Sequence, residues 1–209
     1  MAAAQLGERP KSRIGEAFNM FISLEVRMDP DHRNFMMEVE DYQAKTLSLF
    51  PDKEAKAAKL HTLHITVATL LVQEDETEFV IQSISDAVDQ FKRAYSGPDG
   101  IRANFQGVST FRDIAYLEMS LGANTFKALK DILMVNGINR FVTDQTQTPH
   151  LTYIRRLDLT EVERDMMLTM MENVKTSRIT LDTLSLRMKK QAGEPTRPPV
   201  KLFGLWRED

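Results

Sequence analysis

The chain contains no cysteine among its 209 residues. It therefore has no disulfide, no thiolate zinc site, no cysteine-ligated iron–sulfur cluster and no cysteine nucleophile. No apolar run approaches the roughly 20 residues of a membrane-spanning helix, so we expect no membrane partner. Charge of one sign is not in large excess either, because the net charge is −3 at pH 7. This balance argues against a broadly basic nucleic-acid surface and permits a local cationic pocket.

Two glycine-rich phosphate loops are also absent. The sequence has neither a Gly-x-x-x-x-Gly-Lys loop nor a Gly-x-Gly-x-x-Gly fingerprint. ATP-driven and dinucleotide chemistry are therefore unsupported, and we expect no cofactor. The first residues carry no apolar secretion signal. We expect a cytoplasmic protein, with the nucleus as the alternative.

The composition is that of one folded domain with short appendages. Apolar residues make up 42% and charged residues 27%, as in ordinary globular proteins. Residues 1–15 are small, polar and charged, which indicates a flexible leader. Residues 16–191 form the expected domain. Residues 192–209 form a proline-rich tail, whose apolar segment Val200–Trp206 is expected to dock on the domain as a short strand or an irregular tail.

Strand-like and helix-like segments alternate along the domain, which favours an α+β fold with mostly antiparallel sheet. Period-two or continuous apolar patterns predict strands at Phe18–Val26, Leu63–Val72, Ile101–Phe111, Ala115–Leu121, His150–Arg156 and Arg178–Arg187. Helical periodicity and end signals predict helices at Asp31–Phe50, Glu74–Tyr95, Thr125–Val135 and from Thr160 onward. The last strand changes phase near Asp182-Thr183, which indicates a bulge or a misplaced boundary.

Two of the four histidines occupy the same local pattern. Both His64–Val67 and His150–Tyr153 follow the order His, apolar, Thr, apolar within predicted strands. Alternate side chains of a strand share one face. His64 and Thr66 therefore lie on one face, and His150 and Thr152 lie on one face of the second strand. Each strand buries its apolar side and presents an imidazole beside a hydroxyl.

Two imidazoles and two hydroxyls around one groove suit transfer of a phosphoryl group. One imidazole can accept a proton from a ribose hydroxyl or from water, while the other protonates the leaving oxygen. The threonine hydroxyls can donate hydrogen bonds to phosphate oxygens. A single His-x-Thr is more often an ordinary polar pair of a strand. Its repetition in both halves of the chain is what favours the catalytic interpretation, and no metal is required.

These two motifs resemble the signature of the two-histidine (2H) phosphoesterase superfamily. Within it, the sequence is most similar to the phosphoesterase-like, nucleotide-binding domain of A-kinase anchoring proteins. Asn104–Phe111 resembles the strand before that domain's central hairpin, Thr148–Thr152 its proline-containing second motif, and Leu184–Gln191 its last core strand.

The resemblance implies two pseudo-symmetric lobes, each an antiparallel sheet backed by helices, with a central groove between them. It also implies that His64, Thr66, His150 and Thr152 bind and cleave the phosphate. Relatives bind adenosine or cytidine monophosphate, and several cleave 2′,5′-oligoadenylate. Kinase anchoring depends on a separate amphipathic helix, and residues 192–209 show no sustained apolar helical face.

Three further residues are candidates for substrate binding. Phe111, at a strand end, could stack on a base. Arg156 shares the face of His150 if the strand stays regular, so it could bind a second phosphate, whereas Arg155 would face away. Lys189 is a candidate for backbone contact. All three have the simpler interpretation of exposed strand-end residues.

The other two histidines are assigned no chemistry. His61 lies three residues before His64, an odd spacing that separates two side chains on a strand, so we expect no metal site and an exposed His61. His32 is expected at the solvated start of a helix.

The leading hypothesis is a phosphodiesterase acting on an RNA-type phosphodiester, with 2′,5′-oligoadenylate as the preferred substrate. One alternative is a non-catalytic scaffold or sensor that binds AMP or CMP. Another is a 2′,3′-cyclic phosphodiesterase or an RNA 2′,5′-ligase. We expect a monomer whose partner is a nucleotide or a short oligoribonucleotide.

Overall fold

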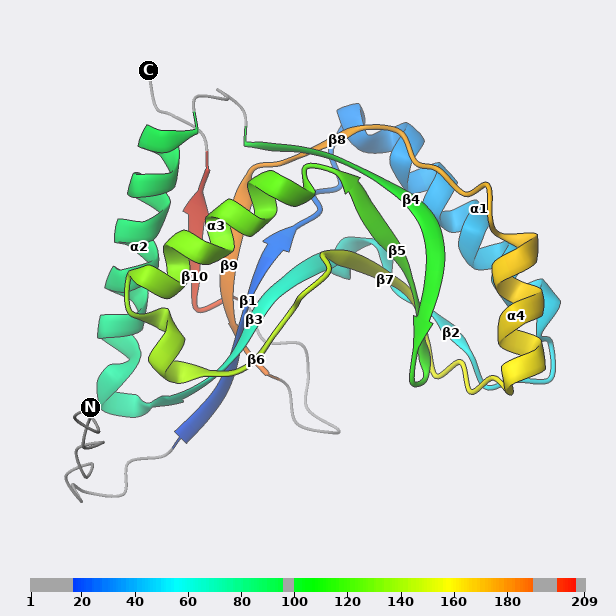
Figure 1. Ribbon diagram of the computed structural model, residues 1–209, viewed down its shortest axis with the longest axis horizontal. Helices are drawn as coiled ribbons and strands as arrows, with labels where there is room; N and C mark the ends of the chain where they lie inside the picture. The colour runs from blue at the N-terminus through cyan, green and yellow to red at the C-terminus, as the bar shows by residue number, and fades with distance from the viewer. Residues whose placement is uncertain (1–16, 96–99, 190–198, 206–209) are drawn as a thin grey trace, which may run out of the picture.

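A computed structural model of the chain describes residues 17–95, 100–189 and 199–205. Its strands form two five-stranded sheets in which every neighbouring pair is antiparallel (Figure 1). The first sheet has the order β10-β9-β1-β3-β6 and the second the order β2-β7-β5-β4-β8. The predicted α+β fold with two antiparallel lobes is confirmed.

The strands of the first sheet are β1 (Ala17–Glu25), β3 (His64–Gln73), β6 (Val142–Gln145), β9 (Thr183–Met188) and β10 (Lys201–Gly204). Those of the second sheet are β2 (Lys56–Ala57), β4 (Ile101–Phe111), β5 (Ile114–Leu121), β7 (His150–Arg155) and β8 (Ile179–Leu181). The sequence did not predict β2 or β6. Both are short edge strands with few apolar residues, and short polar segments carry little strand signal.

Four α-helices cover the sheets: α1 (Arg33–Leu49), α2 (Thr77–Ala94), α3 (Ala123–Val135) and α4 (Glu161–Met170). Short 3-10 turns occur at Pro30–His32, Leu60–Thr62, Glu74–Glu76 and Ile138–Phe141. Helix α4 begins with a capping box, in which the side chains of Thr160 and Glu163 each bond to the other residue's backbone N–H. None of the helices among the described residues combines the length and apolarity that a bilayer span requires.

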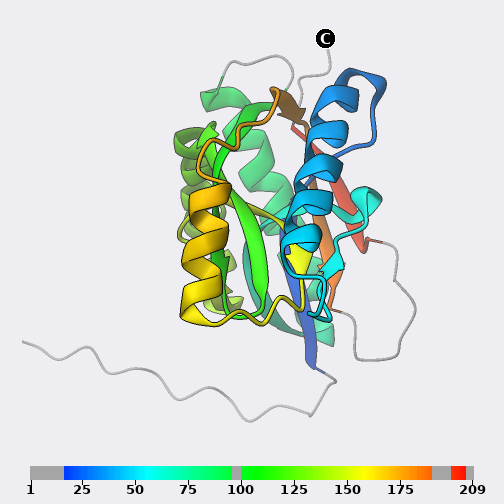
Figure 2. The same cartoon turned by 90° about the vertical axis from the view of Figure 1, so that its right-hand side faces the viewer.

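Helices α2 and α3 lie together beside the first sheet, whereas α1 and α4 lie on the outer side of the second (Figures 1 and 2). The connectivity is crossed, because α1 follows β1 of the first sheet yet packs on β2 and β7 of the second. Likewise, α3 follows β5 of the second sheet and packs on α2. One continuous apolar core therefore joins the two lobes.

The phase change near Asp182-Thr183 reflects a misplaced boundary and not a bulge, because two strands occupy the segment. β8 pairs with β4 in the second sheet, and β9, which is separated from β8 by the single residue Asp182, pairs with β1 in the first. The chain thus changes from one sheet to the other at Asp182. The prediction of a single strand over Arg178–Arg187 was wrong. The residues before Asp182 bury their apolar side chains in one sheet, and the residues after it bury theirs in the other.

The predicted leader, residues 1–15, lies outside the described residues, as do most residues of the tail. The described part of the tail includes β10, which pairs with β9 at the edge of the first sheet. Phe203 and Leu205 bury their side chains there. Trp206, the last residue of the segment expected to dock, lies outside the described residues.

Candidate active site

The two His-x-Thr motifs occupy equivalent places in the two sheets. His64 and Thr66 begin β3, and His150 and Thr152 begin β7, the fourth strand of each sheet when counted from β10 and from β8. All four side chains are half-buried, while the alternate residues Ile65, Val67, Leu151 and Tyr153 are fully buried. The predicted alternation holds in both motifs. We call the face that carries the histidines and threonines the site face of each sheet.

Both imidazole rings are held by the same hydrogen bond. His64 Nδ1 lies 2.8 Å from the carbonyl oxygen of Thr62, and His150 Nδ1 lies 2.9 Å from that of Thr148. A carbonyl oxygen can only accept, so Nδ1 carries the hydrogen and donates it. In the neutral ring Nε2 then bears a lone pair, and it has no hydrogen-bond partner among the described residues. Both rings therefore keep the same nitrogen available for proton transfer.

In the first sheet, His64 lies beside a charged network. Glu25 on β1 is its direct cross-strand partner. Arg187 Nε and Nη2 donate to the two carboxylate oxygens of Glu25 at 3.0 and 2.9 Å, and Ser23 and Ser185 donate to the same carboxylate. Burial alone would raise the pKa of Glu25, but these hydrogen bonds and the Arg187 charge outweigh it, so the pKa is lowered. Glu25 is therefore ionised at neutral pH.

The second sheet repeats this geometry with different side chains. Glu118 on β5 is the cross-strand partner of His150, and Tyr116 is that of Thr152. The Tyr116 and His150 rings are in contact, with their centroids 4.5 Å apart. In the first sheet the ring neighbouring His64 is Phe21, at 5.5 Å. Each histidine thus lies beside an aromatic ring and directly opposite a glutamate.

The two motif strands contact each other where the two sheets meet. Burial lowers the pKa of His64, and the positive charges of Arg155 and Arg187 act in the same direction, against the hydrogen bond to Thr62 and the charge of Glu25. Arg155 belongs to β7 and His64 to β3. The electrostatic interaction between them therefore crosses from one sheet to the other, and it places the end of the second motif strand near the first histidine.

Arg156 was expected to share the face of His150 and Thr152 only if the strand stayed regular, and β7 does not stay regular. In the pairing of β5 with β7, Tyr116 faces Thr152 but the next residue, Ala115, faces Ile154, so β7 contains a bulge. Tyr153 and Ile154 are both buried in the core as a result. Arg155, not Arg156, then returns to the site face. Arg156 lies beyond β7 with a left-handed φ of 58°.

The bulge is supported by side-chain and backbone donors from neighbouring elements. Gln43 of α1 donates to the carbonyl oxygens of Ala58 at 2.7 Å and Tyr153 at 3.1 Å. The backbone N–H of Ala58 also donates to the Tyr153 carbonyl. β3 has a comparable irregularity beside β1, because the neighbouring residues Ile22 and Ser23 pair with Ala68 and Thr66, and Val67 is left between them. In both strands two consecutive apolar residues follow the threonine, which is the sequence signal that the alternation breaks there.

Phe111 and Lys189 lie at strand ends. Phe111 is 58% exposed, and the guanidinium of Arg112, which has a left-handed φ of 54°, lies 5.0 Å from the centre of its ring. The backbone N–H of Lys189 still donates to Asn19 on β1. Strand alternation therefore continues to Lys189 and places it on the same face as Arg187.

His32 and His61 lie apart from the motifs. His61 is exposed in the turn before β3, as expected. His32 is buried, which corrects the prediction of a solvated residue: its Nδ1 donates to the Arg27 carbonyl, and its Nε2 accepts from the Thr180 N–H at 3.2 Å. It thereby ties the start of α1 to β8. Among the described residues, no three His, Cys, Asp or Glu side chains are grouped so that they could hold a metal ion.

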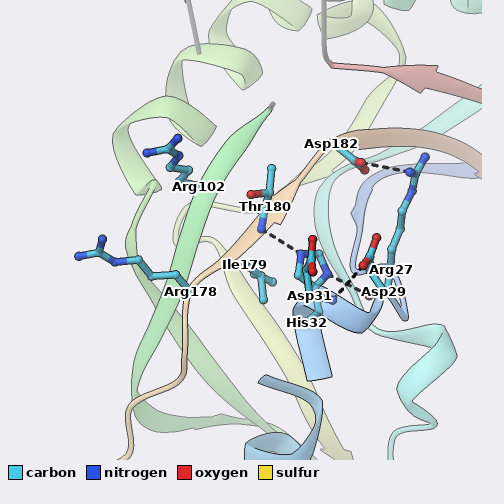
Figure 3. A pocket seen from close by; sticks show the side chains of 9 residues that line it. All are labelled: Arg27, Asp29, Asp31, His32, Arg102, Arg178, Ile179, Thr180 and Asp182. Atoms are coloured by element: carbon cyan, nitrogen blue, oxygen red, sulfur yellow. Dashed lines mark hydrogen bonds and ion pairs between the residues drawn. The ribbon is translucent and has the colours of Figure 1, made fainter. Parts of the chain in front are cut away.

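A cavity of about 520 Å³ lies beside His32 (Figure 3). It is bounded by the loop after β1, the start of β4, and β8 with the residues on either side of it. Both charge signs line it, and one pair of them, Arg27 and Asp182, forms an ion pair at 3.1 Å. It includes neither His-x-Thr motif, so it is separate from the candidate active site.

Comparison with solved structures gives the same two-lobed fold. LigT of E. coli in complex with 3′-AMP has a TM-score of 0.61 and 14% identity over 92% of this chain and 100% of that chain. TT0787 of Thermus thermophilus has a TM-score of 0.61 and 17% identity over 91% and 100%. The MHV ns2 PDE domain has a TM-score of 0.55 and 16% identity over 83% and 99%.

The fold and the two equivalent His-x-Thr strands define a 2H phosphoesterase. The sequence model of the 2′-5′ RNA ligase superfamily matches residues 29–192, and the chain belongs to that family. No curated protein matches the sequence. The closer similarity to the domain of A-kinase anchoring proteins therefore stays a prediction.

Proposed function

We propose that this protein is a metal-independent phosphodiesterase that cleaves an RNA-type phosphodiester, with 2′,5′-oligoadenylate as the leading substrate. The observation that carries the proposal is the matched orientation of the two histidines. Each ring donates Nδ1–H to a carbonyl two residues earlier and keeps Nε2 available. Membership of the 2′-5′ RNA ligase superfamily supports phosphoester chemistry at this site.

In the proposed reaction the four motif side chains act on one phosphate. One imidazole accepts a proton at Nε2 from a ribose hydroxyl or from water, whose oxygen bonds to phosphorus. The other, protonated at Nε2, donates its proton to the leaving oxygen as the old P–O bond breaks. Thr66 and Thr152 donate hydrogen bonds to the non-bridging oxygens. The lowered pKa of His64 keeps it neutral near pH 7 and favours it as the proton acceptor.

The test is cleavage of 2′,5′-linked, 3′,5′-linked and 2′,3′-cyclic substrates in excess EDTA. Loss of one general acid or base lowers rates by about 10²–10⁴-fold. We therefore expect His64→Ala and His150→Ala each to lower the cleavage rate by a factor in that range. His61→Ala is the matched control, because His61 is exposed and precedes the motif strand. Activity that survives the double variant His64→Ala, His150→Ala would refute the proposal.

The second candidate is a module that binds AMP or CMP without turnover. It is favoured by the nucleotides seen in a structural relative, since LigT of E. coli was solved with 3′-AMP and with ATP. Mononucleotide binding by calorimetry, together with no cleavage of any of the substrates above, would favour this alternative. Cleavage confined to 2′,3′-cyclic ends, or joining of RNA ends, would instead identify a cyclic phosphodiesterase or a ligase.

A further inference from the structure

Four residues form one row across the second sheet, next to the catalytic motif. Phe111 on β4 pairs with Ile114 on β5, Ile114 with Arg155 on β7, and Arg155 with Lys56 on β2. Directly paired residues of antiparallel strands point to the same face. Ile114 also shares its face with Tyr116, two residues further along β5, and Tyr116 is the partner of Thr152. The whole row therefore lies on the site face.

The row contains two cations without an anionic partner. Arg155 and Lys56 are both exposed, and neither forms an ion pair with any residue that the structure describes. Arg187, the other arginine near His64, is instead held by Glu25. Like charges directly opposite each other on neighbouring strands destabilise a sheet. An anion between Arg155 and Lys56 would remove that repulsion.

The next row of the sheet toward the motif contains the paired residues Tyr116 and Thr152. The distance between the two rows matches the distance between successive phosphates of a nucleotide chain. Ile114 and Tyr116 are two residues apart on an antiparallel strand, which corresponds to about 7 Å. Their partners Arg155 and Thr152 are separated by the same amount along β7, because the bulge absorbs the extra residue. A phosphate held by Thr152 and a second phosphate held by Arg155 would thus flank one ribose.

We propose that Arg155 and Lys56 form a second phosphate subsite, which binds the phosphate one nucleotide away from the one held by the His-x-Thr motifs. The subsite rests on the proposed function for the identity of the first phosphate. It assigns the substrate class as oligonucleotides or nucleotides with at least two phosphates. The neighbouring Phe111 lies in the same row, where a base attached to the intervening ribose would stack.

Binding tests the subsite without requiring turnover. Adenosine 2′,5′-bisphosphate and AMP are titrated into the protein by calorimetry. We expect the bisphosphate to bind at least tenfold more tightly than AMP, and Arg155→Ala and Lys56→Ala each to remove most of that preference. Arg156→Ala is the matched control, since it removes the same charge one residue beyond the strand, and it should keep the full preference. Equal affinity for the two ligands, or equal loss in Arg155→Ala and Arg156→Ala, overturns the subsite.

Kinetics then identify the source of the second phosphate. The ratio of kcat/KM for 2′,5′-linked pApA to that for ApA reports a terminal phosphate, and the ratio for ApApA to ApA reports an internal one. One of the two ratios should exceed ten in the natural protein and fall toward one in Arg155→Ala. If both ratios equal one while ApA is cleaved, the subsite is refuted and the phosphodiesterase stands. If nothing is cleaved but the bisphosphate preference is present, the phosphodiesterase fails and the subsite stands.

Discussion

Glu25 and His64 are direct cross-strand partners on β1 and β3, and Glu118 and His150 repeat the arrangement on β5 and β7. Among the residues that the structure describes, only the first pair is embedded in a network, because Arg187, Ser185 and Ser23 donate to Glu25. The two halves of the candidate site are thus equivalent in backbone and different in electrostatics. One histidine lies beside an ion pair and the other against the Tyr116 ring.

Neutralising Glu25 should destabilise the fold. Glu25→Gln leaves Arg187 without its counter-charge in a site where the two side chains are only 16% and 26% exposed. We expect a loss of about 1–3 kcal/mol in the free energy of unfolding, measured by urea denaturation at pH 7. Because the pKa of Glu25 is lowered in the folded state, its contribution is present above the ordinary Glu pKa and is lost as the pH falls through the folded value. Asp41→Asn, which breaks the exposed Asp41–Lys45 pair, is the control and should leave the midpoint unchanged.

The titration of His64 should report the charge of Arg155 across the two sheets. The folded protein lowers the pKa of His64, so its imidazole NMR midpoint should lie below the ordinary value of about 6.5. Removing a positive charge stabilises the imidazolium, and Arg155→Ala should therefore raise the midpoint. Arg156→Ala should raise it less. An identical response to both substitutions would contradict the register that places Arg155 on the site face.

The same lowered pKa makes stability depend on pH. The neutral imidazole is favoured in the folded state, so stability is complete above the unfolded pKa of about 6.5 and declines as the pH falls toward the folded value. His64→Asn should lose less stability than the natural protein between pH 7.5 and 5.5. Parallel urea denaturation of both proteins at the two pH values measures the difference, and equal declines would count against a depressed His64 pKa.

Gln43 should control the bulge that orients Arg155. Its buried side chain donates to the carbonyls of Ala58 and Tyr153. Gln43→Leu leaves two buried carbonyls with fewer donors and should cost about 1–3 kcal/mol in unfolding free energy. If the bulge also shifts, the pKa of His64 should rise as it does in Arg155→Ala. Ser48→Ala, on the exposed side of the same helix, serves as the control for helix stability.

Phe111 should contribute to nucleotide affinity and little to folding. Its ring is 58% exposed, and loss of base stacking costs about 1–3 kcal/mol per base. Phe111→Ala should therefore weaken AMP binding by roughly 5- to 150-fold, while Phe111→Trp retains it. Thermal unfolding of both variants checks that the fold is intact. Unchanged affinity in Phe111→Ala would remove this residue from the site.

The major elements were predictable because their signals are local. Strand alternation, helical periodicity and helix end signals depend on neighbours in the sequence, and the corresponding elements are present. The change of sheet at Asp182 was not predictable, since it depends on the distant strands with which the segments before and after Asp182 pair. The position of Arg155 was missed for a related reason: Tyr153-Ile154 is two consecutive apolar residues, and regular alternation was assumed through them.

The crossed packing of α1 and α3 has a consequence for the unfolding of the protein. Each lobe is covered by a helix whose preceding strand belongs to the other lobe. A fragment that ends after β3 would therefore lack α3, and it would carry α1 without the second sheet on which α1 packs. Separately expressed halves should stay unfolded and assemble only when mixed. The spacing between the two histidines is then a property of the whole chain, and denaturant should abolish both halves of the site in a single transition.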